Sequence, residues 1–112
     1  MATSMKKPRF KTVTKEDVLE KMEHAEPVQI VNVLAPEHYH LGVIKGSIRI
    51  PLNELDSRWG ELDKNIEVIT YCASYDCPAS SQAAEKLANK GFKANAYEGG
   101  IKEWKEAGLP LE

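Results

Sequence analysis

The stretch IEVITYCASYDCPASSQAAEKLANK, residues 66–90, decides the fold of this chain. Its first six residues are mostly β-branched or aromatic, which predicts a buried strand. The run from Pro78 to Lys90 predicts a helix, because proline suits the first helical position and Gly91 follows the last one. A loop that joins a strand to a helix N-terminus gathers unpaired backbone N–H groups. We therefore expect the chemistry of the protein at Cys72, where the strand ends.

Cys72 is predicted to be a reactive thiol. The thiolate is the nucleophilic form of cysteine, and the positive end of a helix stabilises it. We expect the pKa of this thiol to lie below the ordinary value of about 8.5, although the charge of Asp76 opposes the effect. The competing interpretation is a buried, inert thiol, since free cysteine is among the most buried residue types.

Strands and helices alternate along the rest of the chain. Thr14 is a good N-cap for a helix, and Asp17 three positions later strengthens that signal. The expected strands are residues 10–13, 28–34, 48–50, 66–71 and 92–97, and the expected helical segments are residues 14–24, 36–42, 52–58, 78–90 and 101–107. This alternation indicates an α/β domain with a mostly parallel sheet. Ligands of such domains bind beyond the carboxyl ends of the strands, where Cys72 falls.

The composition narrows the class of protein. The 112 residues suit one domain, which we assign to residues 10–110 after a flexible N-terminal tail of residues 1–9. The 15 basic and 17 acidic residues leave a net charge of −2, which argues against a nucleic-acid or membrane partner. No apolar run reaches the roughly 20 residues that span a bilayer, and no secretory signal is present. We expect a soluble, cytoplasmic protein.

Three stretches resemble the rhodanese family of sulfurtransferases in its single-domain form. They are VNVLAPEHY at 31–39 with GVIKGSIRIP at 42–51, the pair Tyr71-Cys72 with its tight loop and Ala-rich helix, and EGGIKEWKEAGLP at 98–110. The last stretch is the most specific, and the resemblance covers about residues 10–110. It implies a rhodanese-like three-layer α/β fold, with a mostly parallel five-stranded sheet and helices on both faces.

The resemblance also implies a sulfurtransferase. Cys72 takes a sulfane sulfur from thiosulfate, a persulfide or a polysulfide, holds it as a persulfide, and yields it to a thiol or cyanide. The expected catalytic residues are Cys72 and Cys77, and the expected substrate-binding residues are Ala73, Ser74, Tyr75 and Asp76. The expected partners are a small-molecule sulfur donor and a thiol acceptor, with a reductant protein or a sulfur-relay partner as further candidates. No cofactor and no metal are expected.

The first signature departs from the family pattern. Asn32, Leu34 and Val43 stand where the family usually has Asp, Arg and His. Less polar residues therefore replace an ion-pair scaffold.

The loop departs from the pattern as well. Tyr75 and Cys77 stand where the family has Gly and commonly Arg, and Asp76 adds a negative charge. Thiosulfate is a dianion, so it loses a charge-assisted contact and meets a like charge in this loop. We expect thiosulfate to be a poor donor and a persulfide or polysulfide to be a better one.

Cys77 has several interpretations. It is either a small residue that fills the Arg position or a thiol that resolves or relays the sulfur on Cys72. A metal site is disfavoured, because zinc needs four ligands and the remaining candidates, His38 and His40, lack a helical i, i+4 spacing.

Two further classes of function stay open. One is a thiol–disulfide redox enzyme that uses Cys72 and Cys77 as a dithiol. The other is a non-catalytic rhodanese-like binding or regulatory module, in which replacing Cys72 by serine leaves every activity unchanged. A Cys-x5-Arg phosphatase is excluded, because Pro78 occupies the sixth position after Cys72 and no Arg follows to clamp a phosphate.

Overall fold

A parallel sheet in the strand order β2-β1-β3-β4 lies at the centre of the computed structural model, which describes residues 10–112. The strands are β1 (Val28–Asn32), β2 (Ile48–Arg49), β3 (Glu67–Tyr71) and β4 (Ala94–Tyr97). The register places Asn32 opposite Tyr71, and Tyr71 opposite Tyr97. Strands β1, β3 and β4 therefore end at the same level and share one carboxyl edge.

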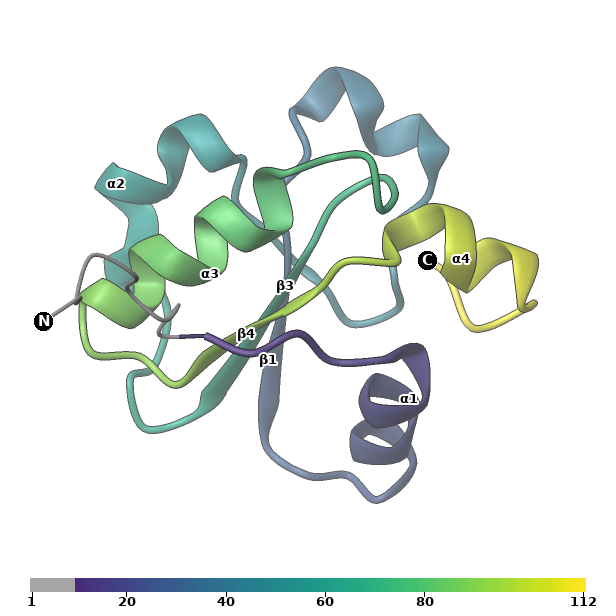
Figure 1. The fold of residues 1–112 in the computed structure, drawn as a ribbon, viewed down its shortest axis with the longest axis horizontal. Helices are drawn as coiled ribbons and strands as arrows, with labels where there is room; N and C mark the ends of the chain where they lie inside the picture. The colour runs from purple at the N-terminus through teal and green to yellow at the C-terminus, as the bar shows by residue number, and fades with distance from the viewer. Residues whose placement is uncertain (1–9) are drawn as a thin grey trace, which may run out of the picture.

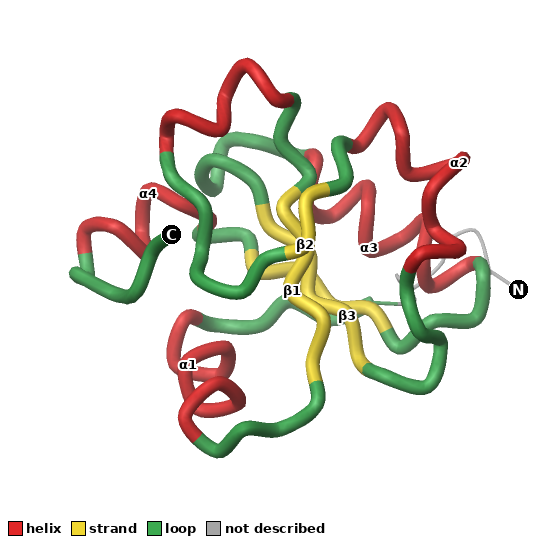
Figure 2. Tube along the Cα trace, turned by 180° about the vertical axis from the view of Figure 1, so that it is seen from behind, coloured by secondary structure: helices red, strands yellow, loops and turns green. Residues whose placement is uncertain are grey.

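Helices cover both faces of the sheet. They are α1 (Lys15–Glu23), α2 (Leu55–Arg58), α3 (Ala79–Asn89) and α4 (Gly100–Glu106), with 3-10 turns η1 (Pro36–Leu41), η2 (Leu52–Glu54) and η3 (Trp59–Glu61). Helices α2 and α3 lie on one side of the strands and α1 and α4 on the other (Figure 1), and the view from behind agrees (Figure 2). The predicted three-layer α/β fold is confirmed. Within residues 10–112, no helix is long and apolar enough to cross a membrane.

The described part of the sheet has four strands, so the expectation of five is wrong. Residues 10–13 meet β4 at a single bridge, between Thr12 and Ala96. Two backbone hydrogen bonds of 2.9 Å hold them there, from Val13 N–H to Ala96 O and from Ala96 N–H to Lys11 O. Pairing goes no further because the next residue, Thr14, already caps α1 and directs the chain into the helix. The predicted tail, residues 1–9, lies outside the described residues.

The helix ends follow the local chemistry of the sequence. The Thr14 hydroxyl accepts a hydrogen bond from Asp17 N–H at 3.1 Å, and the Asp17 carboxylate accepts one from Thr14 N–H at 3.0 Å. This reciprocal capping box confirms the predicted start of α1. Helix α3 begins at Ala79, one residue later than predicted, and Pro78 takes the N-cap position.

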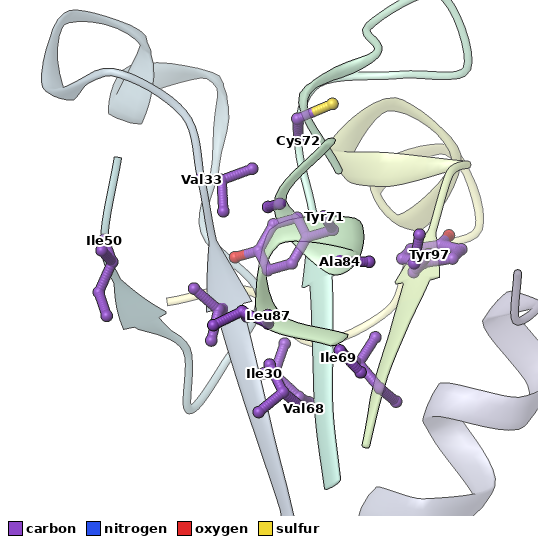
Figure 3. Packing of buried hydrophobic residues seen from close by; sticks show 14 of the residues in the cluster. Ile30, Val33, Ile50, Val68, Ile69, Tyr71, Cys72, Ala84, Leu87 and Tyr97 are labelled. Carbon is purple, nitrogen blue, oxygen red and sulfur yellow. The ribbon is translucent and has the colours of Figure 1, made fainter. Parts of the chain in front are cut away.

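Strand β3 is the most deeply buried strand of the sheet. Val68, Ile69 and Tyr71 have no exposed surface, and Leu87 of α3 and Trp104 of α4 are equally buried. Figure 3 shows side chains of this core along the strands, with Cys72 just beyond the end of β3. A fully buried apolar side chain contributes about 1.5–3 kcal/mol, so the packing fixes β3 from both faces.

The Tyr71 hydroxyl is the centre of a buried polar network. It accepts hydrogen bonds from Ile44 N–H at 2.9 Å and from the Asn32 amide at 3.2 Å, and it lies 2.6 Å from the Ser47 hydroxyl. The Asn32 side-chain oxygen in turn accepts from Leu34 N–H at 2.8 Å. Asn32, where the sequence resemblance leads one to expect Asp, is thus part of a neutral network.

We expect Tyr71→Phe to destabilise the fold by about 1–3 kcal/mol, because it leaves the Ile44 N–H and the Asn32 amide buried without their acceptor. Tyr75→Phe is the matched control, since Tyr75 is 67% exposed, and it should change the stability by less than about 0.5 kcal/mol. Urea unfolding measures both variants. Equal stabilities for the two variants would contradict the role assigned to the network.

Candidate active site

Cys72 is the first residue after β3, at the common carboxyl edge of the sheet. The register brings Val33 and Glu98, the residues that follow β1 and β4, to the same edge. The structure therefore places Cys72 at the carboxyl edge of the sheet, where the sequence analysis expected it (Figure 3).

The start of α4 holds the first residues of the loop. Ile101 N–H donates to the Cys72 carbonyl at 3.0 Å, and Lys102 N–H donates to the Ala73 carbonyl at 2.9 Å. Gly100 has a φ of +66°, and a Cβ atom there would lie 2.5 Å from the Cys72 carbonyl oxygen. Only glycine satisfies both constraints, so the Gly99-Gly100 pair is what allows α4 to approach the loop.

The Cys72 thiol points into the loop that follows it. Its Sγ donates to the Cys77 carbonyl oxygen at 3.3 Å, and it lies 4.0 Å from the Ser74 carbonyl oxygen. The residue itself has no exposed surface. Cys72 therefore rests as a covered thiol inside its own loop.

Burial raises the pKa of Cys72 to about 11, and its hydrogen bond with the Cys77 side chain acts in the same direction. The backbone N–H groups of Ser80 and Ser74 act in the opposite direction, because they favour the thiolate. The prediction of a lowered pKa is wrong for this closed state. The reason is that loss of hydration outweighs the favourable N–H groups at the helix start.

The structure brings all six predicted loop residues together. Ala73, Ser74 and Cys77 are half-buried, whereas Tyr75 and Asp76 are exposed. A turn closes the loop, because Cys77 N–H donates to the Ser74 carbonyl at 3.1 Å.

An acidic cavity of about 310 Å³ lies on one side of the loop. Its carboxylates come from Asp76 of the loop and from Glu103 and Glu106 of α4. Glu103 accepts hydrogen bonds from the Tyr97 hydroxyl at 2.7 Å and from the Tyr75 hydroxyl at 3.3 Å. The loop is thereby tied to α4 by side chains as well as by backbone.

A second cavity, of about 320 Å³, borders Ala73 and Ser74, and its charged lining residues are lysines. Leu41 and Ile101 supply its apolar wall, and Lys102 and Lys105 supply its charge; the Lys105 ammonium group lies 3.4 Å from the Leu41 carbonyl oxygen. The sequence analysis assigned residues 101–107 only to a helix and named none of them as a site residue, so it missed Lys102 and Lys105. The signal that points to them is the Gly99-Gly100 turn, which docks α4 on the loop.

The histidines of η1 do not form a metal centre with the loop. His40 Nδ1 lies 2.9 Å from the Glu37 carbonyl oxygen, within its own turn. Across residues 10–112, no three His, Cys, Asp or Glu side chains are grouped so that they could hold a metal ion.

The rhodanese-like domain family matches residues 14–107. The chain belongs to this family. The match includes the sheet, the loop with both cysteines and the whole of α4, so the family resemblance is confirmed.

Two curated relatives of this rhodanese domain differ in how much of their own length the match covers. A sulfurtransferase of Allochromatium vinosum is 27% identical over 100 residues, which cover 88% of this chain and 92% of that protein. An HTH-type transcriptional regulator of Mycobacterium tuberculosis is 32% identical over 100 residues, which cover 89% of this chain and only 44% of the regulator. The chain thus spans less than half of that regulator and nearly all of the sulfurtransferase.

A solved structure shares the rhodanese fold seen here. A protein from Lactobacillus plantarum superposes with a TM-score of 0.83 at 30% identity, over 90% of this chain and 87% of that chain.

In the protein without an added sulfur, we expect the rate of Cys72 alkylation to keep rising as the pH is raised well above 7. The reason is that the thiol stays protonated until the pH approaches about 11. Cys77→Ala should lower this pKa but leave it above the ordinary value of about 8.5, since burial remains. The measurement is the pH dependence of iodoacetamide labelling, followed on the Cys72 peptide by mass spectrometry. A midpoint at or below the ordinary value in the wild-type protein would contradict the covered state.

Proposed function

We propose that this rhodanese domain is a sulfurtransferase that carries a sulfane sulfur as a persulfide on Cys72. The observation that carries the proposal is the position of Cys72 between the end of β3 and the start of α3, with the N–H groups of Ser80 and Ser74 beside its sulfur. These donors stabilise negative charge on a sulfur atom. The family membership and the relative named a sulfurtransferase support the same chemistry.

The reaction has two displacements at sulfur. The Cys72 thiolate attacks the outer sulfur of a persulfide or polysulfide donor, the donor S–S bond breaks, and the donor leaves as a thiolate or a shorter polysulfide. A thiol or cyanide then attacks the outer sulfur of the Cys72 persulfide, and Cys72 leaves as a thiolate. No net oxidation occurs, and no cofactor is required.

Ser80 offers further support for an added sulfur at this place. Its side chain is fully buried, and within the described residues its hydroxyl has no hydrogen-bond partner. A buried hydroxyl without a partner is unusual and calls for a functional explanation. Ser80, whose N–H favours the Cys72 thiolate, thus also carries a buried hydroxyl that is not used within the described residues.

The covered position of Cys72 requires the loop to open before the first displacement. The bond from Cys72 Sγ to the Cys77 carbonyl must break for the thiol to lose its proton to solvent or substrate. Tyr75 and Asp76 are the exposed part of the loop, so they move outward when the Tyr75 hydroxyl releases Glu103. Opening restores hydration to the sulfur, which lowers its pKa toward the ordinary range.

We expect Cys72→Ser to abolish sulfur transfer from a polysulfide to cyanide, measured as thiocyanate formed above the uncatalysed rate. Ser57→Ala is the control, since its hydroxyl donates only to Glu54 within the described residues, and it should keep full activity. If Cys72→Ser retained wild-type activity, the proposal would fail and the reading as a non-catalytic binding module would stand.

The donor preference follows from the charges of the loop. Asp76→Asn should raise kcat/KM for thiosulfate about twofold to fivefold, because it removes an exposed and partly screened like charge. Asp76→Arg should raise it further through a charge-assisted contact with the dianion. Steady-state kinetics with thiosulfate and with polysulfide test this expectation. A wild-type preference for thiosulfate, or no gain in Asp76→Arg, would show that the loop charge does not select the donor.

A further inference from the structure

The two cysteines of this chain lie in one loop and touch each other. The chain has two cysteines in all, and both are free thiols in the structure. Cys72 Sγ donates a hydrogen bond of 3.3 Å to the backbone carbonyl oxygen of Cys77. The turn from Cys77 N–H to the Ser74 carbonyl, 3.1 Å long, holds Cys77 over Cys72.

The surroundings of the two thiols differ. Cys72 has no exposed surface, whereas Cys77 is half-buried and packs against the edge of the hydrophobic core. An external acceptor reaches Cys72 only after the loop opens, but Cys77 is already beside it. A neighbouring group held in contact reacts as if at very high concentration, so Cys77 has the advantage over a free thiol in solution.

We propose that Cys77 resolves the Cys72 persulfide, so that the domain releases hydrosulfide and forms a disulfide within its own loop. This inference rests on the proposed persulfide on Cys72 and names the group that removes the sulfur. It makes the domain a sulfide-releasing enzyme that needs a reductant, rather than one that only passes sulfur to an external acceptor.

The electrons and atoms of this step balance. The Cys77 thiolate attacks the inner sulfur of the persulfide, the S–S bond to the outer sulfur breaks, and the outer sulfur leaves with the electron pair as hydrosulfide. The sulfane sulfur is reduced, and the two cysteine thiols are oxidised to a disulfide. A dithiol, either a small molecule or a protein, then reduces this disulfide through a mixed disulfide and is itself oxidised. Cys77 is half-buried, so its sulfur is the one that the dithiol can attack.

The geometry of the loop permits the bond. A disulfide requires Cα atoms within about 7 Å of each other. The 3.3 Å contact between the Cys72 sulfur and the Cys77 carbonyl oxygen makes the two residues neighbours in the closed loop, and the bond forms when a movement of the loop brings their sulfurs together.

A single-turnover experiment tests the inference. Wild-type protein, Cys77→Ser and Cys77→Ala are reduced, exposed briefly to inorganic polysulfide, desalted and kept without acceptor. We expect the wild-type protein to release sulfide and to lose the mass of two hydrogens, with peptide mapping showing a disulfide between Cys72 and Cys77. Both variants should retain one added sulfur on Cys72. Their rate of sulfide release should be at least about tenfold lower than that of the wild-type protein. Adding dithiothreitol should restore two free thiols in the wild-type protein.

Two other outcomes would overturn the inference, and they are distinguishable. In the first, the added sulfur stays on Cys72 for the same time in the wild-type protein as in the variants, and the wild-type protein forms no disulfide. Cys77 then does not resolve the persulfide, although the proposed function stands. If neither the wild-type protein nor the variants gain sulfur, and the wild-type protein forms no disulfide, the proposed function fails together with the inference.

Discussion

Two backbone hydrogen bonds, from Ile101 and Lys102 of α4 to the carbonyls of Cys72 and Ala73, are the constraint on which the site depends. They require Gly100 in a conformation with positive φ, because a side chain there would collide with the Cys72 carbonyl. They also place α4 against the loop, and residues of both line the two cavities that share Ser74. The C-terminal signature of the family therefore contacts Cys72 through the backbone.

A second constraint is the burial of Cys72. The sulfur is covered by its own loop and bonded to the Cys77 carbonyl, so the resting thiol is protonated and protected from oxidants. The N–H groups at the start of α3 favour negative charge on the sulfur, but they dominate only when the loop admits solvent or a charged persulfide. In the proposed mechanism, the closed loop therefore separates a covered resting thiol from a reactive open state.

Local signals in the sequence were sufficient for much of the fold. The capping box of Thr14 and the β-branched run before Cys72 lie within a few residues of the structure they specify, and both predictions are confirmed. The fifth strand was wrong because the extent of pairing at residues 10–13 depends on how soon the chain turns into α1. The predicted pKa of Cys72 was wrong because the sequence does not show how closely the loop folds over its own sulfur, and cavity residues such as Lys105 become visible only once α4 is docked on the loop.

The central claim is that Cys72 carries the sulfur, and isotope mapping tests it most directly. Cys77→Ser protein is treated with a polysulfide labelled with a heavy sulfur isotope, trapped with an alkylating agent and digested for mass spectrometry. The account predicts one labelled sulfur on the Cys72 peptide, bound as an alkylated persulfide, and its loss when cyanide is added before trapping. Label absent from Cys72, with its thiol alkylated directly, would contradict the account.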